Sequence, residues 1–171
     1  MTARSLAKSF PVYDFATYLE LEATASLRHE FFHGYIYAMA GGSDDHSGIV
    51  VAAIAELNRR LRAGQRHVRQ GDLKIVTPGE KAAFYPDASV FCGQALGGKA
   101  LTASSPTLIL EVLAPSTRNF DLNTKRKEYF RIPSLCHYLL LDSESMTALL
   151  YTRTRGEVWP KEPEVVQGAQ A

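Results

Sequence analysis

The sequence contains little cysteine and no long hydrophobic run. Only two of its 171 residues are cysteines, Cys92 and Cys136, and they form no CxxC pair. This argues against a disulfide framework or a cysteine-rich zinc site, and we expect both thiols to be small core residues of a reduced, cytoplasmic protein. The N-terminal stretch lacks the apolar segment of a signal peptide, and no run is long enough to span a bilayer.

Motifs of several enzyme classes are also missing. The sequence has no HExxH and no GxSxG, and its GGS stretch at 41–43 lacks the GK[ST] ending of a phosphate-binding loop. Histidines and acids do gather between residues 29 and 46, but without the spacing of a zinc site, so we interpret them as turn or surface residues. These residues are His29, His33, Asp44, Asp45 and His46.

Charge of one sign is not in excess either. The formal net charge is +1, so no general basic field indicates a nucleic-acid partner, although local patches remain open. Hydrophobic residues make up 46% of the chain and charged residues 22%, which are ordinary globular values. We therefore predict a single domain over residues 1–171, with a loose leader at 1–11.

Hydrophobic periodicity predicts alternating helices and strands. Apolar residues three and four apart indicate helices, and β-branched or aromatic runs bounded by turn residues indicate strands. The predicted helices are 14–22, capped by Asp14, 44–63, behind a Ser43 cap, and 119–131. The predicted strands are 66–76, 83–92, 107–113 and 136–142. Two hairpins are also predicted, one about His33-Gly34 and one that joins TALLYTRT to GEVWP with a turn near Arg155 and Gly156. This order predicts an α/β fold with a central mixed sheet flanked by helices.

The stretch 107–142 organises the rest of the chain. Its two strands, LILEVL and HYLLLD, are nearly continuous apolar runs, so we expect them at the centre of the sheet. The intervening helix would make them a parallel, right-handed crossover.

Glu111 interrupts the first of these strands. A buried carboxylate without a partner costs several kcal/mol or becomes protonated, so Glu111 needs a cation. One candidate is a lysine or arginine of the next helix, and the other is a metal ion shared with a second carboxylate. The residues alone leave both open.

Asp87 and Lys125 are positioned to take part. Asp87 begins the strand DASVFC, and if this strand pairs with 107–113, two carboxylates can hold a hard divalent cation. Asp121 and Lys125 are four residues apart, so both project from one helix face. The alternative for this pair is an exposed i, i+4 ion pair.

The segments YPDASVF, LILEVLAPSTRNFDLNTKRKEYF and CHYLLLD resemble the Uma family of bacterial proteins of unknown function, which is classed among the PD-(D/E)XK nucleases. The resemblance runs from Glu30 to Trp159 and implies a restriction-endonuclease-like core. Family members continue past the equivalent of Gln167, so we expect that this chain, which stops at Ala171, is truncated at its C-terminus.

The resemblance also implies residue roles. Asp87 and Glu111 match the two metal-binding carboxylates. The general motif has a lysine two residues after the second acid, where this chain has Leu113, and Lys125 matches a lysine that has migrated to the next helix. Two further matches are an additional acid, Glu30, and a histidine of obscure role, His46.

The implied function is a Mg²⁺- or Mn²⁺-dependent endonuclease that hydrolyses DNA as a homodimer. Asp87, Glu111 and the carbonyl of Val112 would hold the metal, Lys125 would poise the attacking water, and Glu30 would assist. Two alternatives are a catalytically inactive module for DNA binding or dimerisation, and a metal-dependent hydrolase of another phosphate ester.

Overall fold

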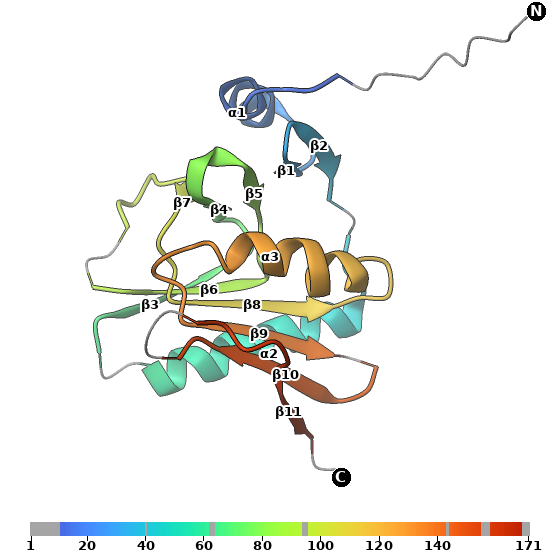
Figure 1. The fold of residues 1–171 in the computed structure, drawn as a ribbon, viewed down its shortest axis with the longest axis vertical. Coiled ribbons are helices and arrows are strands. Elements are labelled where there is room, and N and C mark those ends of the chain that lie inside the picture. Colours follow the sequence, from blue (N-terminus) through green and yellow to red (C-terminus); the bar gives the residue numbers. More distant parts are fainter. Residues whose placement is uncertain are drawn as a thin grey trace, which may run out of the picture.

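The strands separate into two mixed sheets (Figure 1). The fold is given by a computed structural model that describes residues 11–39, 41–61, 64–93, 96–142, 144–154 and 158–168. The five-stranded sheet has the order β2-β1-β5-β4-β7 and the six-stranded sheet the order β11-β10-β9-β8-β6-β3. The strands are β1 His29–Phe32, β2 Tyr35–Ala38, β3 Arg66–Gln70, β4 Lys74–Val76, β5 Ala82–Phe84, β6 Ala88–Cys92, β7 Thr102–Ala103, β8 Leu108–Leu113, β9 His137–Asp142, β10 Thr147–Thr152 and β11 Glu164–Gln167.

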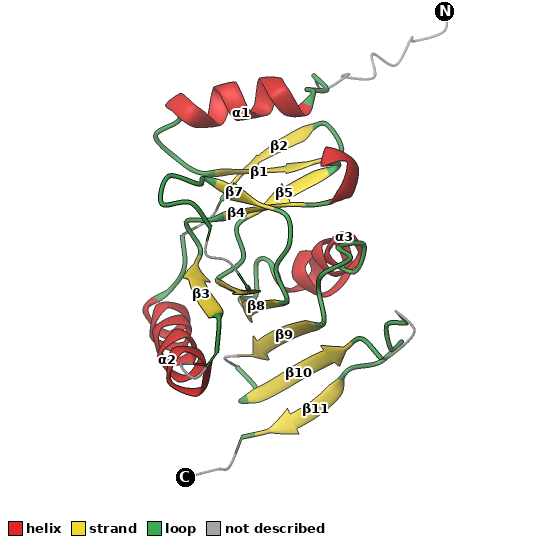
Figure 2. Ribbon diagram, turned by 90° about the vertical axis from the view of Figure 1, so that its left-hand side faces the viewer, coloured by secondary structure: helices red, strands yellow, loops and turns green. Residues whose placement is uncertain are grey.

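Helices cover both faces of the six-stranded sheet (Figure 2). Because side chains alternate along a strand, Leu110 and Val112 of β8 pack against α2 (Asp44–Leu61), whereas Ile109 and Leu113 face the other core. That core contains the π-helical segment η2 (Phe120–Lys125) and α3 (Arg126–Tyr129). Glu111 shares a face with Ile109 and Leu113, so it points toward η2 and α3.

The predicted α/β fold class and the central crossover are confirmed. Strands β8 and β9 pair in parallel with Glu111 opposite Leu140, and they occupy the middle of their sheet. Helix α1 (Phe15–Thr24) begins after Asp14, whose side chain accepts a hydrogen bond from the Thr17 amide at 2.7 Å. The β1–β2 hairpin and α2 also lie where they were predicted.

Two predicted strands were wrong in extent. The run 66–76 divides into β3 and β4, and the run 83–92 divides between β5 and β6. In each case the two strands join different sheets. The first break is a turn at Gly71 and Asp72, and the second is the Pro86-Asp87 step, where proline has no amide for a ladder. Both breaks contain residues that strands disfavour, so the sequence carried a signal for them that the prediction did not use.

The predicted helix 119–131 is not a regular α-helix. Residues 120–125 form a π-helix, and only then does α3 follow. The Asp121 carbonyl accepts the Arg126 amide, an i to i−5 bond, and also the Tyr138 hydroxyl at 3.1 Å. Tyr138 belongs to β9, so a side chain from the sheet inserts into the helical ladder.

The C-terminal hairpin has a different second strand from the one predicted. Its partner for β10 is β11, whereas Trp159 of GEVWP stacks on Phe130 with ring centroids 3.9 Å apart and donates to the Phe130 carbonyl. Packing of the indole on the helix end therefore removes this segment from the sheet. The predicted turn at Arg155 and Gly156 lies outside the described residues.

The prediction that both cysteines are core residues was also wrong. Cys92 ends β6 and Cys136 immediately precedes β9, and both side chains are exposed. Apolar runs reach the rim of the sheet at these positions, where the strands leave the core. Within the part of the chain that the structure describes, no helix has both the length and the apolar character needed to cross a membrane.

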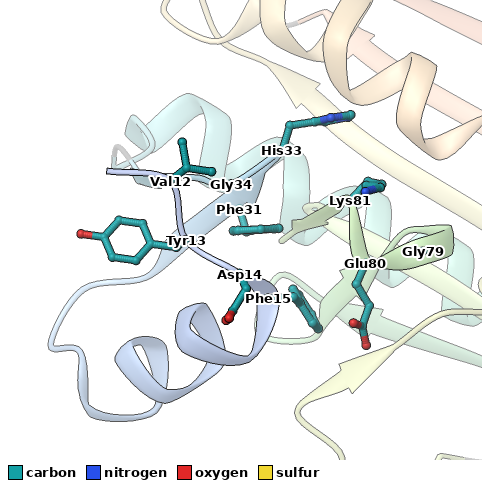
Figure 3. Close-up of a pocket in the computed structure, with 10 residues that line it drawn as sticks. All are labelled: Val12, Tyr13, Asp14, Phe15, Phe31, His33, Gly34, Gly79, Glu80 and Lys81. Carbon is teal, nitrogen blue, oxygen red and sulfur yellow. The ribbon is translucent and has the colours of Figure 1, made fainter. Parts of the chain in front are cut away.

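The segment before α1 lies against the β1–β2 turn (Figure 3). The Tyr13 amide donates to the Gly34 carbonyl at 2.8 Å, and the His33 amide donates to the Lys81 carbonyl at 2.8 Å. Gly34 has φ +90°, and a Cβ there would lie 2.3 Å from Val12 Cγ1. This turn thus requires glycine for both conformation and space.

Gly34→Ala should therefore lower the free energy of unfolding by about 1–3 kcal/mol, because alanine is strained at this φ. Urea unfolding followed by circular dichroism measures it. Gly48→Ala is the matched control: a Cβ on Gly48 in α2 meets nothing within 4 Å, so this variant should keep or raise the free energy of unfolding. Coincident unfolding curves for wild type and Gly34→Ala would contradict the prediction.

Candidate active site

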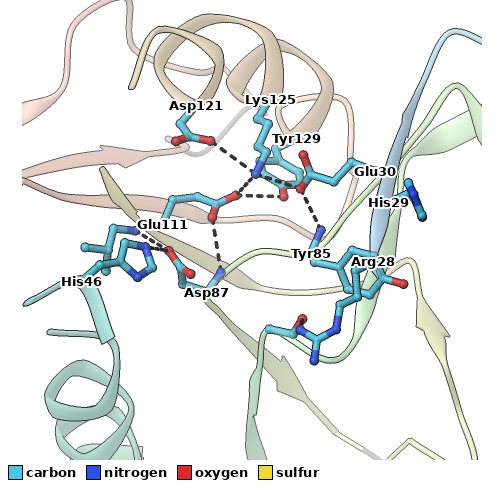
Figure 4. Close-up of polar contacts among 12 residues, drawn as sticks. Arg28, His29, Glu30, His46, Tyr85, Asp87, Glu111, Asp121, Lys125 and Tyr129 are labelled. Carbon is cyan, nitrogen blue, oxygen red and sulfur yellow. Dashed lines mark hydrogen bonds and ion pairs between the residues drawn. The ribbon is translucent and has the colours of Figure 1, made fainter. Parts of the chain in front are cut away.

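Three carboxylates surround the ammonium group of Lys125 (Figure 4). The Nζ atom lies 2.9 Å from Glu30 Oε1, 3.2 Å from Glu111 Oε1 and 3.3 Å from Asp121 Oδ1. All of these residues are buried, with Glu111 only 3% and Lys125 only 6% exposed. This is a buried ion cluster and not the exposed helix pair that was one alternative for Asp121 and Lys125.

The side chains of the cluster come from three elements. Glu30 comes from β1 in the five-stranded sheet and Glu111 from β8 in the six-stranded sheet. Asp121 and Lys125 come from the wide π-helical turn, which directs both inward. The acid–lysine cluster therefore lies where the two sheets and the helix meet.

Asp87 joins the cluster through Glu111. Strands β6 and β8 are antiparallel with Ala88 opposite Leu110, which places Asp87 beside Glu111 and Val112. The Asp87 amide donates to Glu111 Oε2 at 3.3 Å, and the Val112 amide donates to Asp87 Oδ2 at 2.7 Å. His46 Nε2 lies 3.3 Å from the same Asp87 oxygen.

Two tyrosines support the acids. The Tyr129 hydroxyl donates to Glu111 Oε1 at 3.2 Å, and the Tyr85 amide donates to Glu30 Oε1 at 3.2 Å. Glu111 Oε1 thus has Lys125 and Tyr129 as donors, so its position in the apolar core is well defined.

Negative charge exceeds positive charge in this site. Four carboxyl groups, including that of Asp87, face one ammonium group, which would leave an excess of three negative charges with all four ionised and His46 neutral. Burial and then the neighbouring carboxylates raise the pKa of Glu111 well above its usual range. Burial also raises the pKa of Asp87, although the Val112 amide opposes this shift.

Lys125 responds in the opposite sense. Burial by itself would lower the pKa of the ammonium group, but Glu111, Glu30 and Asp121 together raise the pKa above its usual range. Lys125 is therefore held as a cation, and it neutralises only part of the surrounding charge.

Among the described residues, no group of three or more His, Cys, Asp or Glu side chains is arranged to hold a metal ion, so an ion here would depend on a few carboxylate oxygens and on water. Asp121 Oδ1 is buried and accepts no hydrogen bond, because its contact with Lys125 Nζ at 3.3 Å is poorly directed. A cavity of about 90 Å³ opens onto Asp87, Glu111, Asp121 and Lys125, which is room for an ion and a few waters. Carboxylate oxygens with excess negative charge are the ligands that Mg²⁺ and Mn²⁺ prefer.

The structure brings together every side chain named for the site from the sequence. These are Glu30, Asp87, Glu111 and Lys125, with His46 at the edge. The amide of Val112 contacts Asp87, and a metal contact of its carbonyl stays a prediction. Glu111 does have the lysine partner that was one of its two alternatives.

Sequence reasoning missed part of the site. Asp121 was placed on the same helix face as Lys125 but was not assigned to the site, and Tyr85 and Tyr129 were not considered as supports. The tyrosine after Lys125 in TKRKEY was a signal, since Tyr129 is one helical turn further along. The histidines near the N-terminus are dispersed: His29 pairs with Glu22 and His33 with Glu128.

Comparison with known proteins assigns this chain to a family. A family model named Uma2 and described as "putative restriction endonuclease" matches residues 15–170. The chain belongs to the Uma2 family. Two uncharacterized proteins of Synechocystis sp., slr1290 and sll1609, are 35% and 29% identical to it over 159 and 146 residues. The alignments cover 93% and 84% of this chain and 84% and 82% of those proteins.

A solved structure shares the fold. The chain superposes with a TM-score of 0.73 on a crystal structure titled as a "putative nuclease belonging to DUF820" from Anabaena variabilis. The match covers 92% of this chain and 86% of the other, at 18% sequence identity. The Uma2 chain therefore has the fold of that protein, and the resemblance seen in its sequence is confirmed.

Removing the Lys125 charge should destabilise the Uma2 fold. Lys125→Met leaves the carboxylates unneutralised, and we expect a loss of about 3–5 kcal/mol in the free energy of unfolding in buffer with EDTA. Lys127→Met, at an exposed position two residues away, should change it by less than about 0.5 kcal/mol. Equal urea midpoints for the two variants would show that the ion cluster does not stabilise the fold.

Proposed function

We propose that this chain is an endonuclease that hydrolyses phosphodiester bonds of DNA with Mg²⁺ or Mn²⁺. The observation that carries the proposal is the pairing of Asp87 and Glu111 on adjacent antiparallel strands, with more carboxylates than cations around them. The Uma2 family and the shared fold support a nuclease reaction.

Asp87, Glu111 and the Val112 carbonyl would hold the metal ion. When bound, such an ion supplies positive charge to the scissile phosphate and lowers the pKa of water. Asp121 adds a buried carboxylate oxygen without a hydrogen bond at the same cavity. The excess negative charge favours binding of a cation. Because the carboxylates repel a phosphate, a phosphate approaches readily only when that cation is present.

Lys125 would act as a fixed cation and hydrogen-bond donor. Its ammonium group lies between Glu30 and Glu111 and opens onto the cavity, so it can orient the attacking water or donate to a phosphate oxygen as charge develops. Glu30 and Tyr129 hold the ammonium group and Glu111 in place. His46, beside Asp87, is placed to orient that carboxylate.

Glu111→Gln should abolish nicking of supercoiled plasmid in Mn²⁺. The amide has nearly the same shape but no charge for the metal, and we expect the rate to fall about 100-fold or more. Glu20→Gln, an exposed substitution on α1, should cut at the wild-type rate. Equal activity of Glu111→Gln and wild type would overturn the proposed catalytic role.

Mn²⁺ should bind the wild-type protein with calorimetric heat and raise its stability. Binding to the folded state alone adds about 2.7 kcal/mol at a metal concentration one hundred times Kd. Asp87→Asn should lose both effects, and Glu20→Gln should keep them. If the chain is a catalytically inactive module in which the acids form only a structural ion network, neither the wild type nor Asp87→Asn should bind Mn²⁺.

A further inference from the structure

A second cavity adjoins the acid–lysine cluster. It has a volume of about 460 Å³, within the range of small-molecule sites, and its walls are largely aromatic and apolar. It shares Met39, Ser116, Thr117 and Lys125 with the smaller cavity at Asp87 and Glu111, and Glu30 also lines it. A ligand attached to a group at the carboxylates can therefore extend directly into this second space.

The aromatic rings of Phe32, Tyr37 and Phe120 line this second cavity together with Met39, and we call it the aromatic cavity. Phe120 lies in its wall, with its ring centroid 6.2 Å from that of Phe32 and 6.4 Å from that of Tyr37. The Lys125 Nζ atom lies 6.0 Å from the centroid of the same Phe120 ring. The apolar wall thus borders the charged cluster.

Tyr37 is the exposed member of this wall. It lies directly opposite Glu30 in the β1–β2 hairpin, so the two side chains share one face of the hairpin. Its side chain is among the exposed large hydrophobic ones, at 46% exposure. Tyr37 is therefore an aromatic residue that solvent reaches beside a buried acid cluster, and such a ring can stack on a planar ligand.

Resting on the proposed function, we infer that the aromatic cavity holds one unpaired nucleobase next to the scissile phosphate. A nucleobase is planar and uncharged, and bases stack on tyrosine and phenylalanine whatever their sequence. The Ser116 and Thr117 hydroxyls, on the shared wall, can donate to the sugar or phosphate that joins base and reaction centre.

This occupant determines the preferred substrate. A base that is paired and stacked in a duplex cannot enter a cavity between a hairpin and a helix, so it must first leave the helix. Single-stranded DNA, or a duplex with an unpaired base, avoids that cost. The protein should therefore bind and cut unpaired DNA better than a perfect duplex of the same sequence.

The test uses fluorescent oligonucleotides with the full chain. Binding is measured in Ca²⁺ and cleavage in Mn²⁺, each with a single strand and with its perfect duplex. We expect the wild type to prefer the single strand, and Tyr37→Ala to bind it about 10-fold more weakly, as removal of one stacking ring does. Tyr37→Phe should restore binding, because it keeps the ring.

Tyr35→Ala is the matched control. Tyr35 lies two residues away on β2, is 41% exposed and does not line the aromatic cavity, so this variant should behave as wild type. Preference of the wild type for duplex, or equal binding of the single strand by Tyr37→Ala and wild type, would overturn the base site while leaving the nuclease proposal intact. If the wild type neither binds nor cuts any DNA, both proposals fail.

Discussion

The buried ammonium group of Lys125 is the interaction on which this structure depends. Its three carboxylate partners come from the five-stranded sheet, the six-stranded sheet and the π-helical turn, so one ion cluster joins the three parts of the core. Desolvating these charges is expensive, and the cost is partly offset by the ion pairs with Lys125 and by the Tyr129 and Tyr85 donors to Glu111 and Glu30. Loss of Lys125 would leave its carboxylate partners without a compensating cation in the core.

The same cluster has a property that a purely structural network would not require. One lysine cannot neutralise Glu30, Glu111 and Asp121, and Asp87 adds a fourth carboxylate at the cavity. A structural ion pair is most stable when its charges balance, whereas an excess of buried carboxylate is what a divalent cation would complete. In the proposed function, lysine and metal ion would be complementary partners of Glu111, because the lysine contacts Oε1 and Oε2 lies on the Asp87 side.

The hairpin β1–β2 connects the ion cluster with the aromatic cavity. Its inner face carries Glu30 to the ion cluster and Tyr37 to the aromatic cavity, as cross-strand partners. The position of this hairpin depends on Gly34, whose turn packs under the segment before α1. The hairpin is remote in sequence from the strand of Glu111. It nevertheless supplies Glu30 to the ion cluster and the exposed ring of Tyr37 to the aromatic cavity.

The sequence by itself determined the central crossover. Two continuously apolar strands separated by a helix are typical of a parallel strand–helix–strand unit, and β8 and β9 do pair in parallel. The sequence also indicated that Glu111 needs a cation, since a carboxylate in LILEVL cannot be buried alone. The tertiary structure alone decided the division into two sheets at Gly71 and Pro86, because strand propensity does not state which neighbour a strand will join. It likewise decided the π-helical turn and the inward position of Asp121, because the contacts made there come from residues remote in sequence, such as the Tyr138 hydroxyl on the Asp121 carbonyl, and form only when the chain is folded.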